Sequence, residues 1–263
     1  MNMNVKPRIA WSEKAEEKLT GCAMCHLFRG VTPFIRIRNF ATPEECEALV
    51  QAAVAEGFSA YRGVEPVINR IGNTVFEYNS ISKHEYFEKN LSLKAVQDRM
   101  FAKSFNPLER FLELLRARTG TAVGVASNTE GQDYYAGLMR RIEKGTQLHV
   151  DYAPGEQPDW DIASIKEQLV WNLYLRVSDT NSGRTHVFNR QWQPSDDDRK
   201  EGIYGDNKSV VDRCEEASFS PDVGDIVIFN TRNFHYVEPT KGERVAFTSA
   251  IGRTADDEMV LWS

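Results

Sequence analysis

The chain has 263 residues, of which 41% are hydrophobic and 27% charged, a composition typical of globular proteins and unlike that of fibrous or disordered ones. Its 32 basic residues are outnumbered by 38 acidic ones, so the formal net charge is −6. This balance argues against nucleic acid or a membrane surface as a partner, because both attract basic patches. No apolar run approaches the ~20 residues that span a bilayer, and no secretory signal is evident, so we expect a cytoplasmic protein.

The local sequence patterns change character near residue 120. Before that point, residues 34–38 alternate like a half-buried strand, and Thr42 then has the position of a helix N-cap. A second helical zone covers residues 91–118 and is interrupted at Pro107. The first part of the chain is therefore expected to be mainly helical.

After residue 120, short segments rich in β-branched and aromatic residues are separated by Gly, Pro, Asn and Asp. These segments predict strands at residues 136–142, 147–152, 169–177, 185–188, 225–229 and 244–251. Many short strands with turns between them are typical of a sandwich or a barrel. We therefore predict one α+β domain, residues 1–263, in which residues 121–263 form a mainly β core and residues 1–120 support it with helices.

Residues 195–214 are polar and contain glycine, which predicts a long surface loop. A run of six charged residues, 196–201, lies within this segment. Such a loop is either a solvated connection or a lid over a site, and the sequence leaves both interpretations open.

Four cysteines are too few for a disulfide scaffold in a chain of this length. Two of them, Cys22 and Cys25, precede His26 in the C-x-x-C-H pattern of covalent haem attachment. Haem is attached in this way outside the cytoplasm, so the expected location argues against it. The pair is also compatible with a redox couple or with half of a zinc site, but no second C-x-x-C follows. We expect a coincidence or a minor role.

Two histidines and one aspartate are candidates for a metal site. In the predicted strand at 147–152, alternation places His149 and Asp151 on the same face. His235 follows the predicted strand at 225–229. Two imidazoles and one carboxylate on one side of a metal form the facial arrangement that leaves open positions on non-haem Fe(II). Each residue alone is common in loops and strands, so only the joint spacing is informative.

Arg244 lies nine residues beyond His235. A guanidinium at that position could bind the far carboxylate of a keto-diacid bidentately while the other end of the diacid chelates the metal. The alternative is a surface arginine at the start of a strand. Its position relative to the metal candidates favours the first interpretation.

The ordered set of these motifs resembles the prolyl-hydroxylase-type branch of the Fe(II)/2-oxoglutarate-dependent dioxygenases. The resemblance covers about residues 34–263 and begins with the predicted strand at 34–38 and the helix that Thr42 opens. It continues with the His149-Val150-Asp151 motif, with 173–175 leading to 182–188 as in the "YLN…GGxTxF" strands of the family, and with His235 followed by Arg244.

A narrower resemblance is to a bacterial subgroup of carrier-independent aliphatic halogenases and hydroxylases that act on amino acids and alkaloids. It rests on residues 130–134 and on the ending Leu261-Trp262-Ser263. Halogenases of this subgroup have Gly in place of the carboxylate ligand, which leaves a position for halide. Because Asp151 is present here, the resemblance favours hydroxylation over halogenation.

Two positions depart from the family pattern. The family often has Tyr on the strand before the histidine motif, where Ile142 lies, and Ser or Thr two residues after the arginine, where Ala246 lies. Thr248 lies on the same strand face as Ala246 and is a candidate replacement in binding the co-substrate. Ser182 replaces the first of the paired glycines, which is expected to matter little.

The resemblance implies a double-stranded β-helix, the cupin-like jelly roll, with helices packed on one side. It implies that His149, Asp151 and His235 bind Fe(II), that Arg244 anchors 2-oxoglutarate, and that O₂ is the second co-substrate. The expected reaction is hydroxylation of an unactivated C–H bond of a small molecule, with succinate and CO₂ as co-products. The expected substrate is a free or N-modified amino acid or a related natural product.

Three alternatives are left open. The same ligands support desaturation or ring closure. A metal-binding jelly roll that has lost catalysis would also keep this pattern, and an electron-transfer protein would use the C-x-x-C-H site. The sequence also leaves open whether the chain forms a homodimer.

Substrate-contacting residues are predicted on weaker grounds, because polar and aromatic groups near strand ends often line such pockets. Arginines would bind the carboxylate of an amino-acid-like substrate. Each candidate is equally compatible with solvated charge, strand pairing or core packing. The candidates are Arg70, Tyr134, Tyr135, Arg140 and Trp171.

Overall fold

The computed structural model of the protein describes residues 10–11, 18–79 and 81–263. Its α-helices are α1 (Gly21–Phe28), α2 (Pro43–Glu56), α3 (Lys83–Phe101), α4 (Pro107–Thr119) and the single turn α5 (Ala153–Glu156). Short 3₁₀ turns are η1 (Val75–Tyr78), η2 (Asp161–Ser164), η3 (Pro194–Arg199) and η4 (Lys208–Val211). None of the described helices is both long and apolar enough to cross a membrane.

The described strands form one large sheet and two small ones. The strands are β1 (Phe34–Ile37), β2 (Ser59–Ala60), β3 (Asn69–Ile71), β4 (Val123–Val125), β5 (Leu138–Arg141), β6 (Glu167–Val177), β7 (Thr185–Gln191), β8 (Lys200–Glu201), β9 (Gly205–Asp206), β10 (Glu216–Phe219), β11 (Ile226–Asn230), β12 (Asn233–Val237), β13 (Arg244–Arg253) and β14 (Met259–Trp262). The large sheet has the order β1-β11-β6-β13-β5-β3-β2, and β14 pairs with both β13 and β4; a second sheet has the order β10-β7-β12, and β8 pairs with β9.

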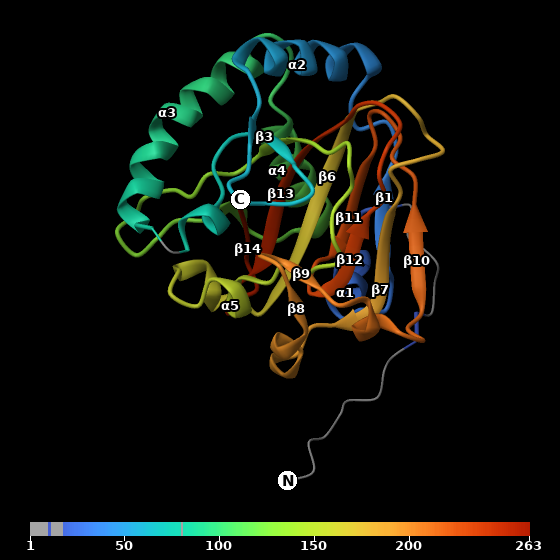
Figure 1. Cartoon of the computed structure of the whole chain (residues 1–263). Coiled ribbons are helices and arrows are strands. Elements are labelled where there is room, and N and C mark those ends of the chain that lie inside the picture. The colour runs from blue at the N-terminus through green and yellow to red at the C-terminus, as the bar shows by residue number, and fades with distance from the viewer. Residues whose placement is uncertain (1–9, 12–17, 80) are drawn as a thin grey trace.

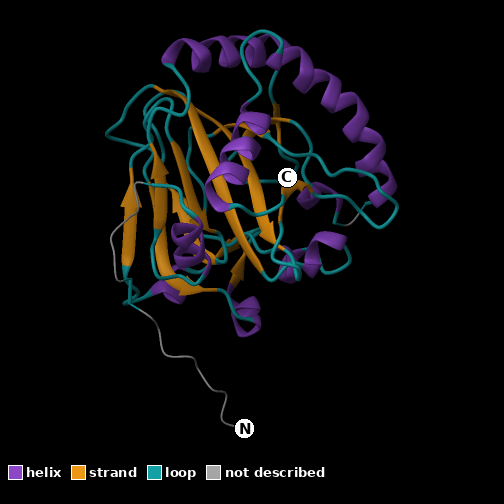
Figure 2. Ribbon diagram, turned by 180° about the vertical axis from the view of Figure 1, so that it is seen from behind, coloured by secondary structure: helices purple, strands orange, loops and turns teal. Residues whose placement is uncertain are grey.

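The two larger sheets lie face to face, and helices cover the outer face of the large sheet (Figures 1 and 2). Alternation along β6 explains this layering. Trp171 and Leu173 point to the helices and join the main core with residues of α1, α2 and α4. Val170 and Tyr174 point the other way and pack between the sheets against Val187 of β7. This is the predicted jelly roll of the α+β class, with helices on one side.

Helix α2 begins as the sequence predicts. The Thr42 side chain accepts a hydrogen bond from the Glu45 backbone, and the Glu45 side chain accepts one from the Thr42 backbone, which together form a capping box. Helix α4 begins at Pro107 after its N-cap Asn106. The helical zone starts earlier than predicted, however, because α3 begins at Lys83 rather than near residue 91.

Three further expectations are corrected by the structure. Residues 147–152 do not form a strand; they pair with β12 through one isolated bridge, between His149 and His235. His235 does not follow a strand but lies inside β12. The strand predicted at 34–38 is present as β1, but the first 120 residues also contribute β2 and β3 to the large sheet and are not otherwise only helical support. The bridge at His149 and the pairing of β3 with β5 join segments distant in the sequence, which local patterns do not reveal.

Candidate metal centre

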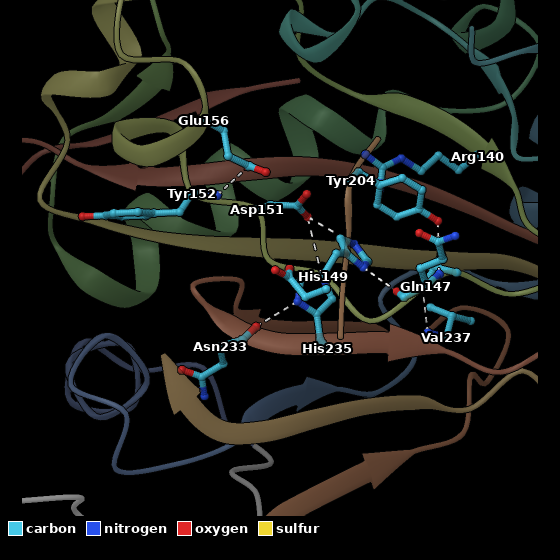
Figure 3. Close-up of polar contacts among 12 residues, drawn as sticks. Arg140, Gln147, His149, Asp151, Tyr152, Glu156, Tyr204, Asn233, His235 and Val237 are labelled. Atoms are coloured by element: carbon cyan, nitrogen blue, oxygen red, sulfur yellow. Dashed lines mark hydrogen bonds and ion pairs between the residues drawn. The ribbon is translucent and has the colours of Figure 1, made fainter. Parts of the chain in front are cut away.

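The three predicted metal ligands converge on one point between the sheets (Figure 3). Their ligand atoms all lie within 4.8 Å of one another. The Nε2 atoms of His235 and His149 are 3.6 Å and 4.0 Å from Oδ2 of Asp151. Within the described residues, this is the only group of three or more His, Cys, Asp or Glu side chains close enough to hold a metal ion.

Backbone hydrogen bonds fix how the two imidazoles point. Nδ1 of His149 donates to the carbonyl of Gln147 at 2.8 Å, and Nδ1 of His235 donates to the carbonyl of Asn233 at 2.9 Å. In this tautomer the Nε2 lone pair of each ring points to the shared centre, as metal-ligating histidines require.

The protonation states also suit a cation. Burial and the neighbouring His235 lower the pKa of His149 to about 3, so that this imidazole is neutral at physiological pH. Burial acts to raise the pKa of Asp151, but the close contact with His235, whose Nε2 lies 3.6 Å from Oδ2, and the neighbouring His149 outweigh it and hold the pKa below its usual range. Neutral imidazole and ionised carboxylate are the forms that bind a metal, so the donor set fits Fe(II).

A glycine allows the histidine segment to approach β12. Gly145 has a φ of +76°, and a Cβ there would collide with the backbone at Val237. Beyond it, the amide of Thr146 donates to Val237, and the amide of Asp151 donates to Thr231. These hydrogen bonds hold residues 146–151 alongside β12. His149 and Asp151 therefore lie next to His235.

An inner cavity, lined by His149, Asp151, His235, Arg244, Thr185 and Asn172 among others, lies behind the three-residue cluster. Arg244 is 3% exposed, and its Nη2 donates to Oγ1 of Thr185 at 3.3 Å. Its guanidinium carbon lies 5.0 Å from the centre of the Tyr174 ring, and its Nε has no hydrogen-bond partner among the described residues. Burial lowers the pKa of Arg244. A buried guanidinium with unsatisfied donors is suited to an anion.

Thr248 does not lie in this inner cavity. Its hydroxyl donates to the carbonyl of Trp171 at 2.9 Å, and the residue lines the outer cavity instead. Thr185, and not Thr248, lines the inner cavity and accepts the hydrogen bond of Arg244. Asn172 is a second polar group that the sequence analysis missed. The sequence pattern could have identified Asn172, because it is a polar residue within an otherwise apolar strand and lies on the same face as Val170.

An outer cavity of about 140 Å³ adjoins the inner one. Its walls are mostly apolar, and it shares His149, Asp151 and Arg140 with the inner cavity. Tyr204, from the 195–214 segment, also lines it; the Tyr204 hydroxyl accepts a hydrogen bond from the Gln147 amide at 3.1 Å. The segment predicted as a connection or a lid thus reaches the cavity, beside the backbone that orients His149.

A half-buried carboxyl in the outer cavity was not anticipated from the sequence. Glu156 comes from the short helix α5, and its Oε2 accepts a hydrogen bond from the Tyr152 amide at 3.0 Å. Burial and the nearby charge of Asp151 raise the pKa of Glu156 to about 8. No local pattern distinguishes this residue from the many exposed glutamates of the chain.

Only one of the predicted substrate residues, Arg140, lines the cavities. Trp171 is fully buried and stacks on Phe111, with ring centres 4.0 Å apart, because its position on β6 faces the helices. Tyr134 packs in an aromatic cluster with Tyr135, which is also buried. Substrate contact is therefore withdrawn for these three residues.

Arg70 likewise lies outside both cavities. Its Nε donates to Glu77 at 2.7 Å and its Nη1 to the carbonyl of Gly72 at 2.9 Å. The ion pair with Glu77 satisfies the guanidinium within η1 and β3. A structural role replaces the predicted contact with substrate.

The C-x-x-C-H segment lies on helix α1. Cys22 is exposed, and its Sγ lies 3.4 Å from Nε2 of His26, whereas Cys25 is partly buried. In the part of the chain that the structure describes, these residues do not belong to a cluster able to hold a metal. Nothing in their geometry supports the haem or zinc interpretations.

Comparison with known proteins places this geometry in a family. Residues 27–262 match the family described as carrier-protein-independent halogenase WelO5. "Leucinostatins biosynthesis cluster protein S" of Purpureocillium lilacinum is 35% identical over 215 residues, which cover 76% of this chain and 87% of that protein. "L-gamma-glutamyl-L-propargylglycine hydroxylase" of Streptantibioticus cattleyicolor is 32% identical over 162 residues, which cover 60% of this chain and 59% of that protein.

A solved structure supports the fold. An N-substituted L-amino acid dioxygenase from Burkholderia ambifaria superposes with a TM-score of 0.63 at 15% identity, covering 92% of this chain and 91% of that one. Fold and family together define the class, the Fe(II)- and 2-oxoglutarate-dependent oxygenases. Within that class, the chain belongs to the carrier-protein-independent halogenase WelO5 family. The resemblance and enzyme class predicted from the sequence are confirmed, and the predicted cofactors Fe(II), 2-oxoglutarate and O₂ are those of the class.

Proposed function

We propose that this enzyme hydroxylates an unactivated C–H bond of a small molecule, either a free or N-modified amino acid or a related natural product, and releases succinate and CO₂. One observation carries the proposal. The metal candidates stand where two cavities meet, since His149 and Asp151 line both cavities and His235 lines the inner one. A metal held there would meet a co-substrate on one side and a substrate on the other.

In this proposal His149, Asp151 and His235 hold Fe(II). The bound metal, with 2-oxoglutarate and O₂, supplies the oxidising chemistry, and the protein supplies position and environment. Arg244 binds the far carboxylate of 2-oxoglutarate through two parallel N–H donors, and Thr185 holds the guanidinium in place. Asn172, which lines the same cavity, donates to a co-substrate oxygen in this proposal.

The intact carboxylate supports hydroxylation rather than halogenation. In the halogenases that the sequence resembles, Gly takes this position and leaves room for halide. Here the Asp151 amide is fixed to the Thr231 carbonyl, and its carboxylate reaches within 3.6 Å of His235. The position that a halide would need is filled by this side chain.

The outer cavity supports a small substrate kept away from water. Val75, Leu138, Val170 and Trp262 are among its apolar wall residues and are all buried. Excluding water around the target bond protects a strongly oxidising centre from side reactions. A cavity of about 140 Å³ favours a small molecule over a macromolecule.

The proposal is tested by incubating the protein with Fe(II), 2-oxoglutarate and a panel of free and N-modified amino acids. We expect iron-dependent succinate release that rises with a true substrate, and a product that has gained one oxygen atom. A product that has lost two hydrogen atoms instead would favour desaturation or ring closure. Iron binding without any succinate release would favour a metal-binding protein that has lost catalysis.

A further inference from the structure

Two titratable side chains, one basic and one acidic, line the outer cavity on opposite sides of Asp151 (Figure 3). Arg140 comes from β5 of the large sheet, and Glu156 comes from helix α5. Both point toward the three-residue cluster. The metal candidates therefore lie between a basic and an acidic side chain.

Arg140 has donors to spare. Its Nε donates to the Tyr61 hydroxyl at 3.1 Å, and its guanidinium lies over the Tyr61 ring. No carboxylate of the described residues forms an ion pair with it. Its neighbour Arg141, which lies on the other face of β5, is paired with Glu143 and Glu243. Tyr61 lines only the outer cavity, so its hydrogen bond with Nε directs the Arg140 guanidinium toward that cavity.

In the described part of the chain, Glu156 lacks a cationic partner, just as Arg140 lacks an anionic one. Its one hydrogen bond among the described residues comes from the Tyr152 amide, and no Lys, Arg or His of these residues lies within ion-pair distance. A carboxylate removed from water without a cationic partner is costly, and a bound cation recovers that cost. An amine of the substrate is the simplest such cation.

Unpartnered hydroxyls accompany the two charges. Oγ of Ser249 and Oγ1 of Thr231 are buried without a hydrogen-bond partner, and both residues line the outer cavity. Ser249 is 2% and Thr231 1% exposed. Buried polar atoms are usually satisfied, so these atoms indicate a ligand with polar groups of its own.

We propose that the substrate is dipolar, with a carboxylate bound by Arg140 and a basic, unacylated amine bound by Glu156. The carbon to be oxidised then lies between these ends, against the metal. This inference rests on the proposed function of the metal site and narrows it. Free and N-alkyl amino acids carry both charges, whereas N-acyl amino acids and amino-acid amides each lack one.

The test measures binding rather than turnover. The protein is loaded with zinc and 2-oxoglutarate, and calorimetry measures the affinity of straight-chain L-amino acids from alanine to norleucine. Each is compared with its N-methyl, N-acetyl and carboxamide derivative. We expect the parent and N-methyl forms to bind best, and the N-acetyl and carboxamide forms to bind roughly 10- to 100-fold more weakly, the range for a lost charge-assisted hydrogen bond.

Two variants assign the ends. Arg140→Gln should abolish the preference for the acid over its carboxamide, and Glu156→Gln should abolish the preference for the amine over its N-acetyl form. Matched controls are Arg141→Gln, on the other face of β5, and Glu113→Gln, exposed on α4. Both controls should keep the full preferences.

Three results would overturn the inference: N-acetyl or carboxamide forms that bind as tightly as the parent, no binding by any parent amino acid, or an Arg140→Gln variant that loses affinity for 2-oxoglutarate alone. Iron-dependent succinate release without added substrate tests the metal site separately. If that release persists while no dipolar compound binds, only this inference fails. If the release is absent as well, the proposed function fails with it.

Discussion

His149 and His235 exchange both of their backbone hydrogen bonds, each at 2.9 Å. The pair is isolated, because neither neighbour of His149 continues a ladder. These backbone bonds alone bring the two imidazole rings together. The Asp151 amide bond to Thr231 extends the same arrangement, so the three candidate ligands are positioned before any metal binds.

The first prediction concerns Asp151. Asp151→Ala should abolish iron-dependent succinate release and lower metal affinity more than roughly 100-fold, since even residues behind the ligands cost 10- to 100-fold. The thermal midpoint of the metal-free protein should stay close to that of the wild type, because the backbone bonds remain. Calorimetric metal titration and circular dichroism measure both effects. Asp159→Ala, an exposed neighbour, is the control, and unchanged metal affinity in Asp151→Ala would contradict the assignment.

The second prediction concerns Arg244. Arg244→Met should remove the rise in thermal midpoint that 2-oxoglutarate produces in the wild type and should raise KM for 2-oxoglutarate roughly 100-fold, because two charge-assisted hydrogen bonds are lost. The ligand-free variant should be at least as stable as the wild type, since an unpaired buried charge has been removed. A retained 2-oxoglutarate shift would show that another residue anchors the co-substrate.

The third prediction tests the core position of Trp171. Phe111→Ala should destabilise the protein by about 3–5 kcal/mol, because it leaves a cavity beside the stacked Trp171 ring. Substrate KM, measured well below the unfolding temperature, should not change. Leu91→Ala, at a position 78% exposed on α3, should change stability by less than about 0.5 kcal/mol. A raised substrate KM in Phe111→Ala, with stability unchanged, would mean that Trp171 contacts the substrate after all.

The fourth prediction concerns acid stability. The hydrogen-bonded Arg110 lowers the pKa of Glu45 from 4.5 to about 2, at an Nη2–Oε1 distance of 2.6 Å. A lowered folded-state pKa stabilises the protein above pH 4.5, and this contribution is lost as the pH falls toward 2. Glu45→Gln keeps the capping acceptor but not the charge.

Glu45→Gln should therefore have a lower thermal midpoint than the wild type at pH 7, and the difference should shrink progressively below pH 4.5. Circular dichroism melts across this range measure it. Glu44→Gln, exposed in the same helical turn, should show a smaller difference at pH 7. A difference for Glu45→Gln that is constant with pH would mean that the charge does not contribute.

The fifth prediction addresses the 195–214 segment. If it closes over the outer cavity, substrate together with zinc and 2-oxoglutarate should slow tryptic cleavage after Arg199 and Lys200, because Tyr204 would be held against the ligand. Cleavage at Lys94, on the distant helix α3, serves as the reference. Equal protection at both places, or at neither, would favour a solvated connection.

Much of the fold could be predicted from local patterns. The capping box at Thr42 and Glu45, and the strands β6 and β13, follow from short-range rules of capping and alternation. The irregular pairing at His149 could not be predicted, because it depends on a partner strand far along the chain. The same holds for the pairing of β1 with β11: the strand itself was predicted, but its partner lies far along the chain.

The sequence by itself determined the chemistry: the ligand types at His149, Asp151 and His235, their order, and an arginine at a fixed distance beyond them. These depend only on which residues stand where. Tertiary structure decided which polar side chains face the cavities, because a strand offers two faces and only packing selects between them. Trp171 packs in the core, Arg70 forms an ion pair with Glu77, and Glu156 lines the outer cavity beside the metal candidates.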